Sequence, residues 1–180
     1  MGLGAMASAG FAAAPSLGWA QAAIEKPPQP QFRSVSLNNL HTGESMEGVY
    51  WDGGDYVPEV LDAVNLHLRD YRTGDVHQID PQLLDLLDSV SALTGSKAPF
   101  EVISGFRSAK TNAMLHEHSA EVAQKSFHVQ GMAIDVRLGD VELRHLHEAA
   151  RSLGRGGVGY YPESNFVHLD VGPVRSWSGT

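Results

Sequence analysis

Two short stretches of the chain carry residues of the kinds that bind a zinc ion. The first is Ser126–Asp135, with the sequence SFHVQGMAID, and the second is Phe166–Asp170, with the sequence FVHLD. A catalytic zinc ion takes three protein ligands, drawn from imidazole nitrogen and carboxylate oxygen when thiolates are absent, and keeps one position for water. His128, Asp135 and His168 supply such a set. The two stretches therefore predict the two halves of one metal site.

The hydrophobic pattern around these residues predicts how they converge. Residues 132–137 alternate between two faces, which predicts a strand with Asp135 on the face opposite its larger apolar neighbours. Residues 166–171 alternate as well and place His168 on one face of a second strand. Two neighbouring strands would direct both side chains into one cleft. Gly131 precedes the first strand and tolerates unusual backbone angles, which would let the residues before it fold back toward the cleft.

An ordinary structural role is the alternative for each of these residues. The chain contains 9 histidines, and a single histidine ahead of a strand is more often a surface or capped residue than a ligand. A single aspartate in an apolar strand is harder to explain in this way, because an unpaired buried carboxylate is costly. The residues alone favour the metal site without deciding the question.

Several segments together form a pattern that is typical of one group of peptidases. They are SGFRS at 104–108, TN at 111–112, S-x-H-x-x-G-x-A-x-D at 126–135, GVGYY at 157–161, FVHLDVG at 166–172 and VRSW at 174–177. With these segments, residues 99–177 closely resemble the murein endopeptidase branch of the zinc D-Ala-D-Ala peptidase superfamily, the LAS-type metallopeptidases. The segment NNLHTGE at 38–44 is also similar to that branch, so the resemblance extends over most of the chain.

The resemblance implies a zinc-dependent peptidoglycan (murein) endopeptidase, a metallopeptidase that hydrolyses peptide cross-links in the bacterial cell wall. His128, Asp135 and His168 would hold Zn²⁺, which lowers the pKa of a bound water to about 7. Arg107 would bind a substrate carboxylate or stabilise the developing oxyanion. Ser126 would contact the substrate or support a ligand.

One position departs from the pattern of that superfamily. Several relatives place an acidic general base three residues before the last zinc histidine, where this chain has Asn165, which cannot take up a proton at neutral pH. Asp170 and Glu163 are the remaining candidates. Asp170 lies two residues after His168 in the predicted strand, so both side chains would leave the same face. We therefore expect Asp170 to be the catalytic base, with a hydrogen bond to backbone or to a ligand histidine as its alternative role.

Composition sets further bounds. A chain of 180 residues with 42% hydrophobic content suits one compact domain. A net charge of −8 and a pI near 5.5 argue against a surface that binds nucleic acid through its phosphates. The absence of cysteine excludes disulfides and thiolate zinc ligands. The resemblance described above implies that the partners are the stem peptides of peptidoglycan, and we expect a monomer.

The beginning of the chain predicts export. An uncharged apolar run ends in Ala20-Gln21-Ala22, the small-x-small pattern of a signal-peptidase site. We expect a signal peptide at 1–22, a proline-rich linker at 23–31 and a zinc peptidase domain at 32–180, in a periplasmic protein without a membrane span after processing. The first basic residue is Lys26. A start at an internal methionine of a longer, twin-arginine leader would explain the missing basic region.

The remaining pattern predicts an α+β fold, with helices packed on an antiparallel sheet and the metal site in a groove on that sheet. Strands are expected at 32–38, 45–51, 100–103, 132–137, 158–161 and 166–171, and helices at 57–69, after an N-cap at Asp80, after a cap at Ser108, and at 141–153.

Two other functions remain open from the sequence. A D,D- or L,D-carboxypeptidase that trims stem peptides would use the same site. A zinc-containing peptidoglycan-binding module without catalysis would be compatible with Asn165, which cannot act as a base.

Overall fold

A computed structural model describes residues 1–2, 31–119 and 122–180 of the chain. Apart from residues 1, 2 and 31, the expected signal peptide and linker lie outside the described residues, so both stay predictions. None of the helices in the described ranges is long and apolar enough to cross a lipid bilayer.

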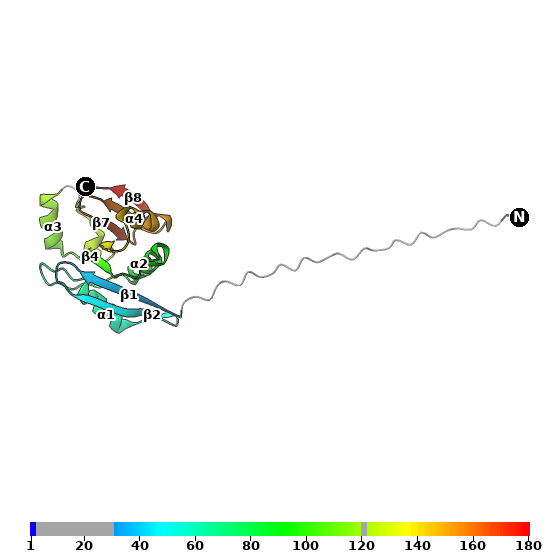
Figure 1. The fold of residues 1–180 in the computed structure, drawn as a ribbon, viewed down its shortest axis with the longest axis horizontal. Coiled ribbons are helices and arrows are strands. Elements are labelled where there is room, and N and C mark those ends of the chain that lie inside the picture. The colour runs from blue at the N-terminus through cyan, green and yellow to red at the C-terminus, as the bar shows by residue number, and fades with distance from the viewer. Residues whose placement is uncertain (3–30, 120–121) are drawn as a thin grey trace.

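A mixed sheet of eight strands forms the centre of the described fold (Figure 1). In spatial order the strands are β3 (Asp55–Tyr56), β2 (Ser45–Asp52), β1 (Phe32–Asn39), β4 (Phe100–Ser104), β5 (Ala133–Leu138), β7 (Phe166–Asp170), β6 (Gly157–Tyr161) and β8 (Arg175–Ser178).

The sheet confirms the predicted α+β class, but it is not antiparallel throughout. Strands β1 and β4 pair in parallel, as do β6 and β8, while the other neighbouring pairs are antiparallel. Parallel neighbours need a long connection instead of a hairpin. Here β2, β3 and two helices intervene between β1 and β4, and β7 intervenes between β6 and β8.

Local signals at their ends explain where the helices begin. In α2 (Pro81–Thr94) the Asp80 carboxylate accepts a hydrogen bond from the Gln82 backbone N–H, and Gly95 ends the helix with φ of 69°. In α3 (Ala109–His118) the Ser108 side chain accepts a hydrogen bond from the Thr111 backbone N–H and caps the helix. Helices α1 (Pro58–His67) and α4 (Leu143–Ser152) match the two remaining predictions.

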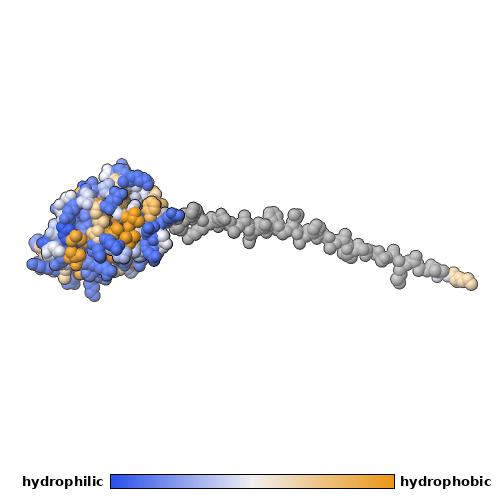
Figure 2. Space-filling model, turned by 90° about the horizontal axis from the view of Figure 1, so that it is seen from below, coloured by the Kyte–Doolittle hydropathy of each residue, from blue (hydrophilic) through white to orange (hydrophobic). Residues whose placement is uncertain are grey.

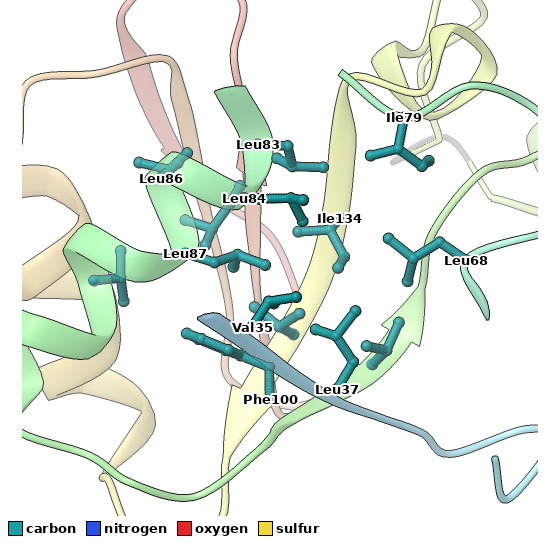
Figure 3. Packing of buried hydrophobic residues seen from close by; sticks show 14 of the residues in the cluster. Val35, Leu37, Leu68, Ile79, Leu83, Leu84, Leu86, Leu87, Phe100 and Ile134 are labelled. Carbon is teal, nitrogen blue, oxygen red and sulfur yellow. The ribbon is translucent and has the colours of Figure 1, made fainter. Parts of the chain in front are cut away.

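Helix α2 packs on one face of the sheet and forms the main core with it (Figure 3). Leu83, Leu84 and Leu87 of α2 lie toward Ile134 of β5, and all four are fully buried or nearly so. Helix α4 contacts α2 and strands β5, β6 and β7. Successive side chains of a strand point to opposite faces, so the burial of Ile134 against α2 directs Asp135 to the other face.

The molecular face seen in Figure 2 is mostly hydrophilic, with hydrophobic side chains gathered in separate groups. Exposed large hydrophobic residues in the described ranges include Phe32, Leu66, Val76 and Val174. Scattered exposure of this kind is normal for a protein surface and needs no binding partner to explain it.

Candidate metal centre and its cleft

The three predicted ligands meet at one point on the sheet. Asp135 in β5 and His168 in β7 are direct cross-strand neighbours, and His128 approaches them from the segment before β5. The ligand atoms of the three residues all lie within 4.8 Å of one another. His168 Nδ1 is 2.8 Å from Asp135 Oδ1, and His128 Nε2 is 3.2 Å from each of these two atoms.

A short 3-10 helix, Phe127–Gln130, carries His128 into the cluster. The Ser126 hydroxyl caps this helix by accepting from the His128 backbone N–H. Gly131 ends the helix with φ of 68°, and a Cβ there would lie 2.2 Å from the Gln78 carbonyl oxygen, so only glycine fits. The predicted reversal before β5 is therefore present, and Ser126 supports the backbone of a ligand.

The outer contacts of the two histidines determine which ring nitrogens carry protons. His128 Nδ1 lies 2.7 Å from the Gly105 carbonyl oxygen, which can only accept, so Nδ1–H is the donor. His168 Nε2 lies 3.0 Å from Asp170 Oδ2 and donates to it for the same reason. Neutral imidazoles held in this way turn the lone pairs of His128 Nε2 and His168 Nδ1 toward Asp135 Oδ1.

This arrangement fits a cation. Two nitrogen lone pairs and a carboxylate oxygen face one another at about the distance of hydrogen bonds, with no proton left to place between them when both imidazoles are neutral. Two imidazoles and one carboxylate form a ligand set that zinc uses in catalytic sites. The outer hydrogen bonds are of the kind that orient metal-bound histidines.

Electrostatics favour the protonation states that ligands need at two of the three residues, His128 and Asp135. Burial lowers the pKa of His128, which keeps its imidazole neutral. Burial opposes ionisation of Asp135, but its interactions with His128, with the Arg107 guanidinium and with His168 outweigh it and hold the pKa of that carboxyl well below its usual range. Burial also lowers the pKa of His168, but hydrogen bonds to Asp135 and Asp170 outweigh it and raise that pKa. Of the three residues, His168 is therefore the one at which a cation competes with a proton.

Arg107 lies beside the ligands and holds one of them. Its Nη2 donates to Asp135 Oδ2, and its Nε donates to Ser104 Oγ at 2.8 Å. The side chain is 13% exposed and lines the cleft over the cluster. Nη1 has no hydrogen-bond partner within the described ranges, so it is the part of the fork left to face a ligand. The predicted role of Arg107 at substrate stays a prediction, and its contact with Asp135 was not foreseen.

Asp170 lies on the opposite side of the His168 ring from the three-ligand cluster. His168 presents Nδ1 to Asp135 and Nε2 to Asp170. The Asp170 carboxylate is fully buried and accepts from the backbone N–H groups of Gly157 and Gly172 and from both Nη atoms of Arg175. Burial opposes its ionisation, but the hydrogen bonds from His168, Arg175 and Gly172 outweigh this effect and lower the pKa of Asp170 below the usual range.

This position argues against Asp170 as a general base beside a metal-bound water. A base must reach the proton that it takes, whereas Asp170 has His168 between itself and the cluster. Its contacts favour the alternative role, in which it orients His168. Glu163 and Asn165 lie in the turn between β6 and β7 and do not line the cleft. Among the described residues, Asp135 is the one carboxylate that lines it.

A cleft of about 550 Å³ opens over the cluster. Its lining residues are Arg107, Ser119, Val122, Ala123, Lys125, Ser126, Phe127, His128, Asp135, Tyr161, Ser164, Phe166, His168, Pro173, Arg175 and Trp177. Three of them are cationic and one is anionic, on a chain with a net charge of −8. The cleft is therefore cationic on an acidic protein, which favours an anionic ligand.

Trp177 lines the cleft and is held in place by two neighbouring side chains. Its ring lies 5.2 Å from that of His168, and its Nε1–H donates to Tyr161 Oη at 2.8 Å. A Cβ at Gly159 would lie 2.7 Å from the Trp177 ring. The alternate glycines of GVGYY were the available signal, because glycine within a strand often marks a close approach of other atoms.

Comparison with known proteins gives the chain a family. The model of the family described as peptidoglycan L,D-endopeptidase MepK matches residues 28–177. The peptidoglycan L,D-endopeptidase MepK of Escherichia coli K12 is 46% identical over 148 residues, which cover 82% of this chain and 81% of the relative. The probable peptidoglycan L,D-endopeptidase MepK of Haemophilus influenzae is 42% identical over 151 residues, 83% of this chain and 81% of the relative. No solved structure matches the chain significantly.

The matched region contains the three converging residues and all of the segments that carry the resemblance seen in the sequence. That resemblance to the murein endopeptidases of the zinc D-Ala-D-Ala peptidase superfamily is confirmed. The chain is a peptidase that belongs to the family described as peptidoglycan L,D-endopeptidase MepK.

Proposed function

We propose that this protein is a zinc-dependent peptidoglycan endopeptidase that hydrolyses peptide cross-links in the cell wall. The observation that carries the proposal is the meeting of two imidazole lone pairs and a carboxylate oxygen at the floor of one cleft. The names of the relatives support peptidoglycan as the substrate and an endopeptidase reaction. A cell-wall substrate in turn supports a periplasmic location, in agreement with the predicted signal peptide.

In this proposal His128, Asp135 and His168 would hold the zinc ion, which would supply a water of lowered pKa and polarise the scissile carbonyl. Asp170 fixes the His168 ring so that Nδ1 faces the cluster. Arg107 fixes the Asp135 carboxylate through Nη2, and its unpartnered Nη1 stabilises the negative charge that develops on the carbonyl oxygen of the substrate.

Ser126 supports the site by holding the short helix that carries His128. Its hydroxyl lines the cleft and caps the 3-10 helix that carries His128. We assign it the task of holding the His128 backbone, with substrate contact through the same hydroxyl as its second role.

Digestion of purified sacculi tests the proposal. The zinc-loaded protein is incubated with sacculi, and the soluble peptides are separated and identified by mass. Cross-linked dimers should be converted into single stem peptides, and a His128→Ala variant should leave them intact. Release of D-alanine without loss of dimers would show a carboxypeptidase instead. Binding to sacculi without any product would show a binding module.

A further inference from the structure

The Arg175 guanidinium is fixed in the cleft wall by a buried carboxylate. Nη1 donates to Asp170 Oδ1 at 3.0 Å, and Nη2 donates to Asp170 Oδ2 at 2.6 Å, so the end of the fork is fully used. The second hydrogen of Nη1 goes to the Pro173 carbonyl oxygen at 3.0 Å. Asp170 is itself fixed by backbone N–H groups and by His168. Two hydrogen bonds, from Arg175 to Asp170 and from His168 to Asp170, therefore connect the guanidinium to a proposed metal ligand.

The other edge of the same guanidinium is free. Nε–H and the outer hydrogen of Nη2 have no hydrogen-bond partner among the residues that the structure describes. These two groups point in parallel from one side of a planar fork, and such an edge matches the two oxygens of a carboxylate. The Arg175 side chain is 40% exposed and lines the cleft. The Arg107 side chain is only 13% exposed, and its Nε and Nη2 already donate hydrogen bonds to Ser104 and Asp135.

The surroundings hold this fork rigid before any ligand arrives. The Arg175 Cζ lies 5.1 Å from the centre of the Phe127 ring and 5.0 Å from that of Trp177. A Cβ at Gly157 would lie 2.5 Å from Arg175 Nη1 and 2.4 Å from Asp170 Oδ2, so the neighbouring strand leaves room for both groups. A donor pair that is already oriented loses little freedom when it binds, which raises its contribution to affinity.

We propose that Arg175 is a specificity-determining residue, which binds a free carboxylate of the stem peptide close to the scissile bond through its Nε and Nη2 edge. The inference deepens the proposed function and rests on it for the choice of stem peptides as ligands. The cationic lining of the cleft on a chain of net charge −8 agrees with a ligand that carries carboxylates.

A set of synthetic peptides tests this assignment. A single stem peptide, which contains no cross-link, is made with all its carboxylates free and then with each one replaced in turn by a carboxamide. Binding to the zinc-loaded protein is measured by calorimetry. One replacement should raise Kd for the wild-type protein about 10–100-fold, since hydrogen bonds to charged groups contribute on that scale. The cross-linked dimer with the same replacement is assayed separately for cleavage.

Two variants show whether Arg175 is the group that binds this carboxylate. Arg175→Lys keeps a positive charge beside Asp170 but lacks the fork, so the carboxylate and carboxamide peptides should bind to it within about 3-fold of each other. Lys125→Gln removes another cation of the same cleft, and it should weaken all the peptides alike and keep their ratio, because a point charge is not selective for this edge.

Two results would overturn the assignment. In the first, no carboxamide replacement weakens binding to the wild-type protein, a result that does not depend on how any variant folds. In the second, Arg175→Lys keeps the wild-type ratio between the two peptides. Binding that depends on Arg175 and the carboxylate, without cleavage of the dimer, would support the assignment and contradict the proposed endopeptidase.

Discussion

Two consecutive residues, Arg107 and Ser108, serve two buried carboxylates of different character. Ser108 donates to Asp70 Oδ2 from its backbone N–H at 2.9 Å and from its hydroxyl at 2.7 Å. Arg107 donates to one oxygen of Asp135. Asp70 is 1% exposed and Asp135 is 3% exposed, so burial does not distinguish them.

The difference lies in what the remaining oxygen meets. Asp70 Oδ1 accepts from the Arg72 backbone N–H at 3.0 Å, so both its oxygens are satisfied by donors. Asp135 Oδ1 meets the ring nitrogens of His128 and His168, whose protons are committed elsewhere. A buried carboxylate with a full set of donors is a structural element. One that faces lone pairs instead offers a place for a cation.

The strongest test of this contrast is a matched pair of substitutions. Asp135→Asn should reduce the zinc content from about one ion per chain to background and abolish hydrolysis, because a charged ligand is lost. Asp70→Asn should leave the zinc content of the folded protein unchanged. Elemental analysis of both variants measures this, and equal zinc in the two would contradict the assignment of Asp135.

Arg107→Lys separates the support of Asp135 from the chemistry on the substrate. An ammonium keeps the charge beside Asp135, but its single nitrogen cannot contact Asp135 and also place a donor where Nη1 of the arginine lies. Zinc should therefore remain while kcat falls about 10²–10³-fold. Arg137→Lys is the control, since Arg137 pairs with Glu101 and does not line the cleft. Wild-type turnover in Arg107→Lys would show that the residue only supports the fold.

Asp170→Asn distinguishes an orienting residue from a base. Loss of the contact that orients His168 should weaken zinc binding about 10–100-fold, and added zinc should restore most of the activity. A general base would behave differently: zinc would stay bound, and the rate would fall about 10²–10⁴-fold at any zinc concentration. Zinc affinity by chelator competition, together with kcat at saturating zinc, decides between the two.

Asp70 predicts an acid-dependent part of the stability. Burial opposes its ionisation, but hydrogen bonds from Thr111, Ser108 and Arg72 outweigh it and lower its pKa to about 2. An unfolded aspartate has a pKa of about 3.9, so the folded state binds the proton more weakly. Asp70 therefore contributes about 2 kcal/mol to the free energy of unfolding above pH 4, and this contribution disappears as the pH falls to about 2.

Urea unfolding of the wild type and Asp70→Asn as a function of pH measures this contribution. The wild type should be more stable at neutral pH, and the two free energies should converge below about pH 4. A constant difference down to pH 2 would mean that the loss in the variant comes from packing and not from the charge.

The parts of the fold that were predictable depend on local signals. Helix α2 begins after Asp80, which caps it as expected, and it ends at Gly95, which adopts the left-handed conformation that glycine favours. The alternation around Asp135 and His168 predicted two strands with these residues on a common face, and the strands are neighbours in register. Local pattern was sufficient because each strand buries one apolar face against the helices.

What escaped prediction depends on distant partners. Strand β8 has little apolar alternation and is defined by its parallel pairing with β6. The spacing of His168 and Asp170 placed both side chains on one face, but the pairing of each ring nitrogen depends on the rotamer of His168, which sequence does not specify. Arg175 lies in the VRSW segment that contributes to the resemblance, but no local signal indicated its role, because its partner Asp170 is buried by residues from other strands.

Zinc K-edge absorption on the zinc-loaded protein tests the central claim most directly. We expect a low-coordinate site with two imidazole nitrogens and oxygen ligands at about 2.0–2.2 Å, and the loss of one imidazole in His168→Ala. A six-coordinate shell of oxygen without imidazole scattering, or a spectrum unchanged by His168→Ala, would contradict the assignment of His128, Asp135 and His168 as the metal ligands.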